Sequence, residues 1–111
     1  MPAFRAANSA VASGGTLTIT KPTGTAANDV LIASVAVTPS SVTITPPSGW
    51  TLVRRVDNAG PTSNSLAVYY KVAGGSEPAS YAFGMSGASF GVGGVQGFTG
   101  VDPANPIHLE N

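Results

Sequence analysis

The sequence lacks cysteine entirely and has few charged residues. Without cysteine the chain has no disulfide, no thiolate chemistry and no cysteine zinc site. Its five basic and five acidic side chains make up 9% of the 111 residues and cancel in net charge. Because nucleic acids are bound through clustered basic side chains, this composition argues against nucleic acid as a partner.

Long apolar runs are also missing. The longest, residues 30–37, is far shorter than the ~20 residues that a helix needs to cross a bilayer, so we expect no membrane insertion. Residues 1–15 contain one arginine and no sustained apolar stretch, so they do not resemble a secretory signal. Either the protein is assembled inside the cell that makes it, or a signal has been removed.

Residues for catalysis or metal binding are scarce. His108 is the single histidine, and the five carboxylates show no ligand spacing. Ser86, in GMSG, does not match the G-x-S-x-G nucleophile elbow. The glycine run at 91–97 fails the dinucleotide-binding spacing, because Gln96 stands where the third glycine belongs. We therefore predict a protein that is not an enzyme and holds no cofactor and no metal.

Short runs of alternating apolar and polar residues, separated by Gly, Pro, Ser, Thr and Asn, predict β-strands. Leu17 and Ile19 alternate with threonines in one half-buried strand, and residues 42–45 form a short edge strand. Residues 30–37 are apolar except for Ser34, which favours a central strand covered on both faces. A buried helical turn is the alternative there.

A hairpin is predicted in the second half of the chain. In residues 66–72 the larger apolar side chains alternate with a set that includes Tyr69 and Lys71, and we place this set on the exposed face. The cluster at 73–78, with two glycines and a proline, predicts a turn. Residues 80–86 alternate again. We expect two antiparallel strands whose aromatic face is covered by other parts of the chain.

The glycine-rich run that follows predicts an irregular strand. Phe90 and Val92 fit one face and Val95 fits the opposite one. A bulge at Gly93 and Gly94 would restore the register and bend the strand. Small residues at this place also allow another backbone to approach closely.

Together these elements predict an all-β fold, an antiparallel β-sandwich that is jelly-roll-like, with seven or eight short strands and no helix. The sandwich is expected to occupy residues 16–101. Residues 1–15, rich in Ala, Ser and Gly, are expected to be a flexible arm that can add as a strand to the sheet of another copy. Residues 102–111 are expected to form a C-terminal tail.

Three segments together are similar to a known module: DVLIASV at 29–35, PPSGWTLVRRVD at 46–57, and residues 66–85 followed by VQGFTGVDPANPI at 95–107. They resemble a β-sandwich, jelly-roll-like module of bacteriophage virion proteins, such as tail appendages and head decorations, and of modular bacterial surface or secreted proteins. The resemblance implies an adhesive or structural role and supplies no catalytic residue. In proteins of this type further strands generally follow the segment at 95–107. If the chain is complete without them, the sandwich is expected to lack a strand and to have an open sheet edge.

Two functions remain open at this stage. The first is a non-enzymatic structural module of a phage virion, a capsid decoration or tail-fibre domain, which acts through self-association or contacts with other virion proteins; a Met-Pro start without a signal favours this location. The second is a carbohydrate-binding module of a secreted or cell-surface protein. In that case exposed Tyr69 and Trp50, with Arg54 or Arg55, form a platform for a sugar ring. The alternative for Trp50 is a core residue that plugs one end of the sandwich.

Overall fold

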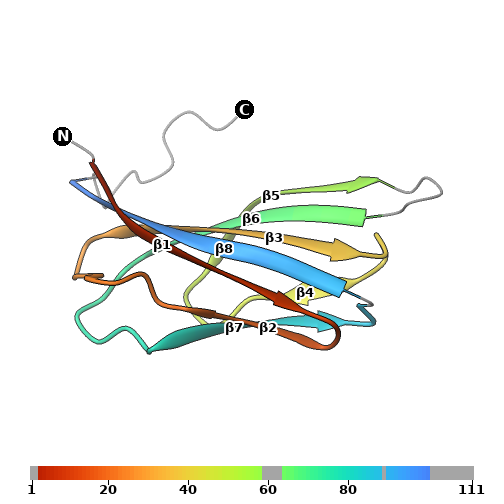
Figure 1. The fold of residues 1–111 in the computed structure, drawn as a ribbon. Helices are drawn as coiled ribbons and strands as arrows, with labels where there is room; N and C mark the ends of the chain where they lie inside the picture. Colours follow the sequence, from red (N-terminus) through yellow and green to blue (C-terminus); the bar gives the residue numbers. More distant parts are fainter. Residues whose placement is uncertain (1–2, 59–63, 89, 101–111) are drawn as a thin grey trace.

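The computed structural model describes residues 3–58, 64–88 and 90–100, which form eight strands in two antiparallel sheets and no helix (Figure 1). One sheet has the strand order β1-β8-β3-β6-β5 and the other β2-β7-β4. The predicted all-β sandwich is confirmed. The strands are β1 (Ala3–Ala12), β2 (Thr16–Thr20), β3 (Val30–Thr38), β4 (Thr43–Thr45), β5 (Thr51–Asn58), β6 (Asn64–Val72), β7 (Ser80–Ser86) and β8 (Phe90–Thr99).

The strand pairing is nested, because β1 pairs with β8, β2 with β7 and β3 with β6. This is the winding of a jelly roll, except that β5 pairs with β6 and leaves β4 at an edge. Every pair of consecutive strands except β5 and β6 is therefore divided between the two sheets (Figure 1). The predicted short edge strand near residues 42–45 is confirmed as β4.

The predicted hairpin of β6 and β7 is wrong, because the two strands lie in opposite sheets. Both edges of β6 are occupied, one by β3 and the other by β5. The seven residues that connect β6 to β7 are long enough to cross the sandwich, since packed sheets lie only ~10 Å apart. The turn at 73–79 therefore joins the two layers instead of closing a hairpin.

The expected orientation of β6 is also wrong. Ala67 and Tyr69 are fully buried, whereas Leu66 on the other face is 48% exposed. The Tyr69 ring packs on Phe83 of β7, with centroids 5.6 Å apart. Lys71 shares this face and reaches Glu77 at the end of the sandwich, where its side chain is only 18% exposed. Alternation defines the two faces of a strand, but it does not say which one is covered when both carry apolar residues.

The central position of β3 is confirmed, because β3 pairs along its length with both β6 and β8. Its covering on both faces is not. Leu31, Val35 and Val37 point into the core and are buried, while on the opposite face Ser34 is exposed and Val30, at the start of the strand, is buried. Within residues 3–58, 64–88 and 90–100, no strand packs over the face of the five-stranded sheet that points away from β2, β7 and β4.

The predicted bulge in β8 is absent, since β8 pairs with β3 in one uninterrupted register. Simple alternation places Val95 inside and Val92 outside. The predicted close approach of other backbone to this glycine-rich strand is found at Gly93. A Cβ on Gly93 would lie 2.6 Å from the Ser34 carbonyl oxygen and 3.0 Å from Cδ2 of Leu17. Glycine here lets the second sheet pack directly on the backbone of β8.

The core fills the space between the two sheets. Leu17 and Ile19 of β2 are fully buried, as the alternation in 16–20 predicts. Trp50 is 8% exposed, and its ring meets Tyr81 edge to face with centroids 5.1 Å apart. The core-plug interpretation of Trp50 is therefore confirmed. Its Nε1 is buried and has no hydrogen-bond partner.

The N-terminal segment that was expected to be an arm is largely strand. Ala3–Ala12 forms β1, which lies along β8 at the edge of its own sheet. Asn8 Nδ2 donates to the carbonyl of Lys21 at 3.1 Å, which holds β1 beside the end of β2. Exchange of this strand between copies stays a prediction. The expected tail at 102–111, with His108, lies outside the described residues.

Candidate functional site

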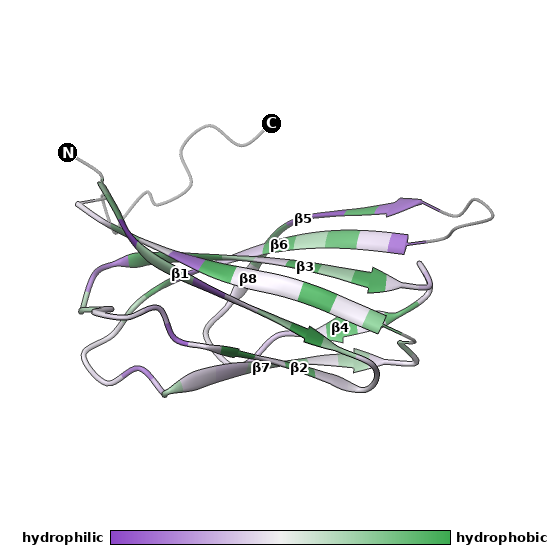
Figure 2. Ribbon diagram, viewed as in Figure 1, coloured by the Kyte–Doolittle hydropathy of each residue, from purple (hydrophilic) through white to green (hydrophobic). Residues whose placement is uncertain are grey.

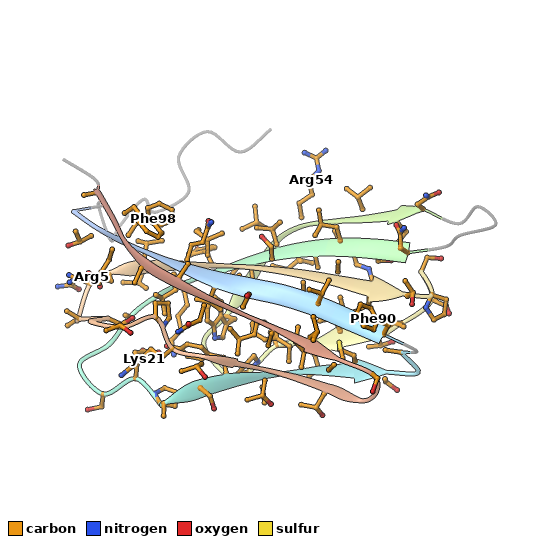
Figure 3. The ribbon with its side chains drawn as sticks, in the orientation of Figure 1. Arg5, Lys21, Arg54, Phe90 and Phe98 are labelled. Carbon is orange, nitrogen blue, oxygen red and sulfur yellow. The ribbon has the colours of Figure 1, made fainter. Side chains whose placement is uncertain are left out.

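The four residues expected at a ligand or interface site do not come together on one surface. Trp50 and Tyr69 are both buried, and each packs on Phe83, so neither offers a face to a sugar. Arg55 reaches the chain before β4, where it donates to the carbonyls of Ser40 and Val42. Arg54 instead projects from β5 away from the three-stranded sheet (Figure 3). The predicted aromatic platform with an arginine neighbour is therefore not formed by these residues.

Arg55 closes one open side of the sandwich. Its Nη2 donates to the carbonyl oxygens of Ser40 at 3.0 Å and of Val42 at 2.6 Å, and its Nε donates to Asp57 Oδ1 at 2.8 Å. The Ser65 hydroxyl donates to the same carboxylate. These hydrogen bonds from Arg55 and Ser65 lower the pKa of Asp57. The cluster joins the edge strand β5 to the chain just before β4, so its arginine is already engaged.

Glu77 fixes the connection between β6 and β7. It accepts hydrogen bonds from the backbone N–H of Gly74 at 2.8 Å and from the Tyr81 hydroxyl at 2.9 Å, and it pairs with Lys71 Nζ at 3.0 Å. Burial raises the pKa of Glu77, but these three partners outweigh burial and lower it. Burial and the nearby carboxylate together raise the pKa of the Tyr81 hydroxyl. The Glu77 carboxylate therefore has a structural role, because it holds the connection between β6 and β7 to both strands.

Asp29 anchors the start of β1. Arg5 donates to its two carboxylate oxygens at 2.6 and 3.2 Å, and the backbone N–H of Ala26 donates at 3.0 Å. Burial raises the pKa of Asp29, and the donors Arg5 and Ala26 more than offset that effect. The ion pair therefore attaches the edge strand to the connection between β2 and β3.

Neither of two common functional features is found in the described part of the chain. No group of three or more His, Asp or Glu side chains is placed there to hold a metal ion. Nor do those residues contain a helix of the length and hydropathy needed to span a membrane.

Exposed apolar side chains gather on a different surface of this molecule. We call it the outer face: the side of the five-stranded sheet that points away from the three-stranded sheet. Strand register places nearly all exposed large apolar residues of the described chain on it, with Leu52 at the β5 edge as the exception. Hydrophobic residues recur along β3, β6 and β8 in Figure 2. Those of the outer face are Phe4, Val11, Val56, Leu66, Phe90 and Val92.

The outer face is built in rows that cross all five strands. Directly opposite pairs in consecutive strands define each row. The Val92 row consists of Val56, Leu66, Ala36, Val92 and Val11. The neighbouring Gly94 row consists of Arg54, Val68, Ser34, Gly94 and Ser9.

The two rows differ in height over β8 and β1. Val92 is 39% exposed and Val11 is 68% exposed, so the Val92 row forms a ridge. Beside it, an open hollow of about 360 Å³ lies over the same strands, lined by Ala7, Asn8, Ser9, Gly94 and Gln96. The hollow exists because Ser9 has a small side chain and Gly94 has none. The outer face therefore has both a projecting and a receding part.

Sequence reasoning missed the outer face, although its signal was present. Phe90 and Val92 were assigned correctly to one face of β8, but no prediction was made of whether that face is covered or exposed. Leu66 and Tyr69 lie on opposite faces of β6, so both faces of this strand carry apolar side chains. A sheet of five strands with apolar residues on both faces needs two covering layers, and the strands of the described residues supply one.

A scan against protein-family models and searches of curated proteins and of solved structures found no match to this chain. The fold and the outer face therefore carry the functional argument.

Proposed function

We propose that this chain is a non-enzymatic structural module that acts through protein-protein contacts made by its outer face. The observation that carries the proposal is the concentration of exposed apolar side chains on one side of one sheet. Scattered apolar residues are ordinary on protein surfaces, but a contiguous patch marks an interaction site. Interface centres are also depleted in charge, and Arg54 is the single formal charge in the two rows that cross this face.

We infer further that the partners are components of a bacteriophage virion, in a capsid decoration or a tail fibre. Support comes from the sequence resemblance carried by residues 29–35, 46–57, 66–85 and 95–107, and from the sandwich fold. The polar clusters around Arg55, Glu77 and Asp29 support a structural role, because each one fastens two segments of the chain and leaves no reactive group beside it.

Binding of a glycan at a cell surface is the alternative function. The residues first expected to stack on a sugar, Trp50 and Tyr69, are buried, so nothing in their geometry favours it. We therefore treat glycan binding as an outcome of the test below.

Site-specific photo-cross-linking in the cells that make the protein tests the proposal. A photoreactive residue, p-benzoylphenylalanine, replaces Val92 on the outer face, and a matched variant carries it in place of Thr18, which is exposed on β2 in the opposite sheet. We expect covalent protein adducts from the Val92 position and none from Thr18. Absence of protein adducts at Val92, together with binding of the purified chain to a glycan array, would overturn the proposal in favour of carbohydrate binding.

A further inference from the structure

The outer face has the dimensions of a protein-protein interface. Five strands spaced ~4.8 Å apart, with the width of their side chains, span roughly 24 Å, and nine residues at ~3.3 Å span about 30 Å. The product is roughly 700 Å² on one copy, close to the ~800 Å² per partner of a stable complex. A partner of this size covers the whole face.

The shape of the face favours another copy of the same face. The Val92 row and the Gly94 row are adjacent and parallel, and they lie ~6.6 Å apart, the separation of alternate residues along a strand. A two-fold axis between the rows and parallel to them places each Val92 row on the Gly94 row of the other copy. Val92 then lies over Gly94 and Val11 over Ser9, so the ridge of each copy enters the hollow of the other.

Charge is compatible with this arrangement. The net charge of the chain is zero, so no long-range repulsion separates two copies. Arg54 lies on the edge strand β5, at the end of its row that is farthest from the hollow. A long side chain at the margin keeps its guanidinium in water while its stem covers apolar surface.

We propose that the outer face is the contact of a symmetric dimer of this chain, in which the Val92 row of each copy packs on the Gly94 row of the other. This inference rests on the proposed function, since it names the partner of the same surface. The contact is isologous and therefore closes with two copies.

Sedimentation equilibrium of the purified full chain at micromolar concentration tests the inference. Val92→Lys adds a charge to the row that is proposed to enter the hollow of the other copy, and Thr18→Lys adds the same charge to the opposite sheet as the matched control. We expect a dimer for the unchanged chain and for Thr18→Lys, and a monomer with an unchanged thermal midpoint for Val92→Lys. A monomeric unchanged chain, or a dimer that survives Val92→Lys, would overturn the inference.

A second variant distinguishes association through complementary shape from non-specific association of apolar surfaces. Ser9→Phe fills the hollow and makes the face more apolar at an exposed position of the edge strand β1. If the ridge enters the hollow, dimerisation weakens by about tenfold or more despite the added apolar area. Equal or tighter association of Ser9→Phe would contradict the proposed packing.

The two proposals fail in different ways. If the purified chain is monomeric while the photoreactive residue at position 92 captures a different protein in cells, the dimer is wrong and the interaction module stands. If neither self-association nor capture occurs, both are wrong.

Discussion

The inner and outer faces of the five-stranded sheet use the same strands and similar residues, yet in the part of the chain that the structure describes a second sheet covers only the inner face. On β3, Val35 is fully buried while Ser34 beside it is exposed. On β6, Tyr69 is 3% exposed and Leu66 is 48% exposed. The three-stranded sheet packs on one face of the five-stranded sheet and cannot also cover the other face. The comparison shows that apolar side chains occur on both faces of the sheet, and that the face on which the second sheet packs is the core.

The largest expected effect concerns the inner side. Phe83→Ala removes a fully buried ring that contacts both Trp50 and Tyr69, so we expect a loss of about 3 to 5 kcal/mol in the free energy of unfolding. Leu66→Ala on the outer face is the contrast, with a change within about 0.5 kcal/mol. Urea denaturation, at a concentration where the chain is monomeric, measures both. Equal losses would mean that the outer face is also core.

Two neighbouring glycines of β8 sharpen the same comparison. A Cβ on Gly93 meets the backbone carbonyl of Ser34 at 2.6 Å, which cannot move away without disturbing the sheet. We expect Gly93→Ala to cost about 1 to 3 kcal/mol through overpacking. Gly94 points outward, where the nearest atom to an added Cβ is the Asn8 carbonyl oxygen at 3.1 Å, so Gly94→Ala costs less. Thermal unfolding of the pair gives the order, and the reverse order would contradict the assignment of faces.

The edge strand β1 carries part of both faces, and its attachment is testable. Arg5→Ala leaves Asp29, whose side chain is 3% exposed, with the Ala26 N–H and the Thr99 hydroxyl as its remaining donors. We expect a loss of about 1.5 kcal/mol, typical of a hydrogen bond to a charged group. Arg54→Ala on the outer face serves as the control, with a smaller change. If the two substitutions cost the same, the Arg5 ion pair does not hold β1.

The smallest effect is the pH dependence of that ion pair. The folded-state pKa of Asp29 lies below its ordinary value of 3.8, so the unfolded chain binds the proton first as the pH falls. The stability supplied by Arg5 is therefore fully present above that value and is lost as the pH falls through the folded-state pKa. The difference in unfolding free energy between the unchanged chain and Arg5→Ala should be constant near neutral pH and shrink in acid. A difference that grows in acid would contradict the assigned pairing.

The positions of most strands could be predicted from the sequence, because alternation and turn residues are local signals. Leu17 and Ile19 in β2 and the apolar run of β3 are examples. The pairing of strands could not be predicted in the same way. β6 and β7 are close in sequence and look like a hairpin, but β5 and β3 occupy both edges of β6, and that competition involves residues far apart in the chain.

The candidate site was harder to predict for a related reason. Tyr69 was expected outside because the other face of β6 carries more large apolar residues, including Leu66 and Val68. Burial of Tyr69 depends on Phe83, which lies in the opposite sheet. The outer face, in turn, exists only once five strands have assembled in register, and no single strand reveals it.

The most direct test of the account is an NMR experiment on a mixture of ¹³C-labelled and unlabelled chains, which detects only contacts between copies. The methyl groups of Val92 and Val11 should show such contacts, and those of Leu31 and Val35 on the inner face should show none. Absence of contacts at Val92, or contacts that arise from the β2 side at Thr18, would contradict the claim that the outer face joins two copies.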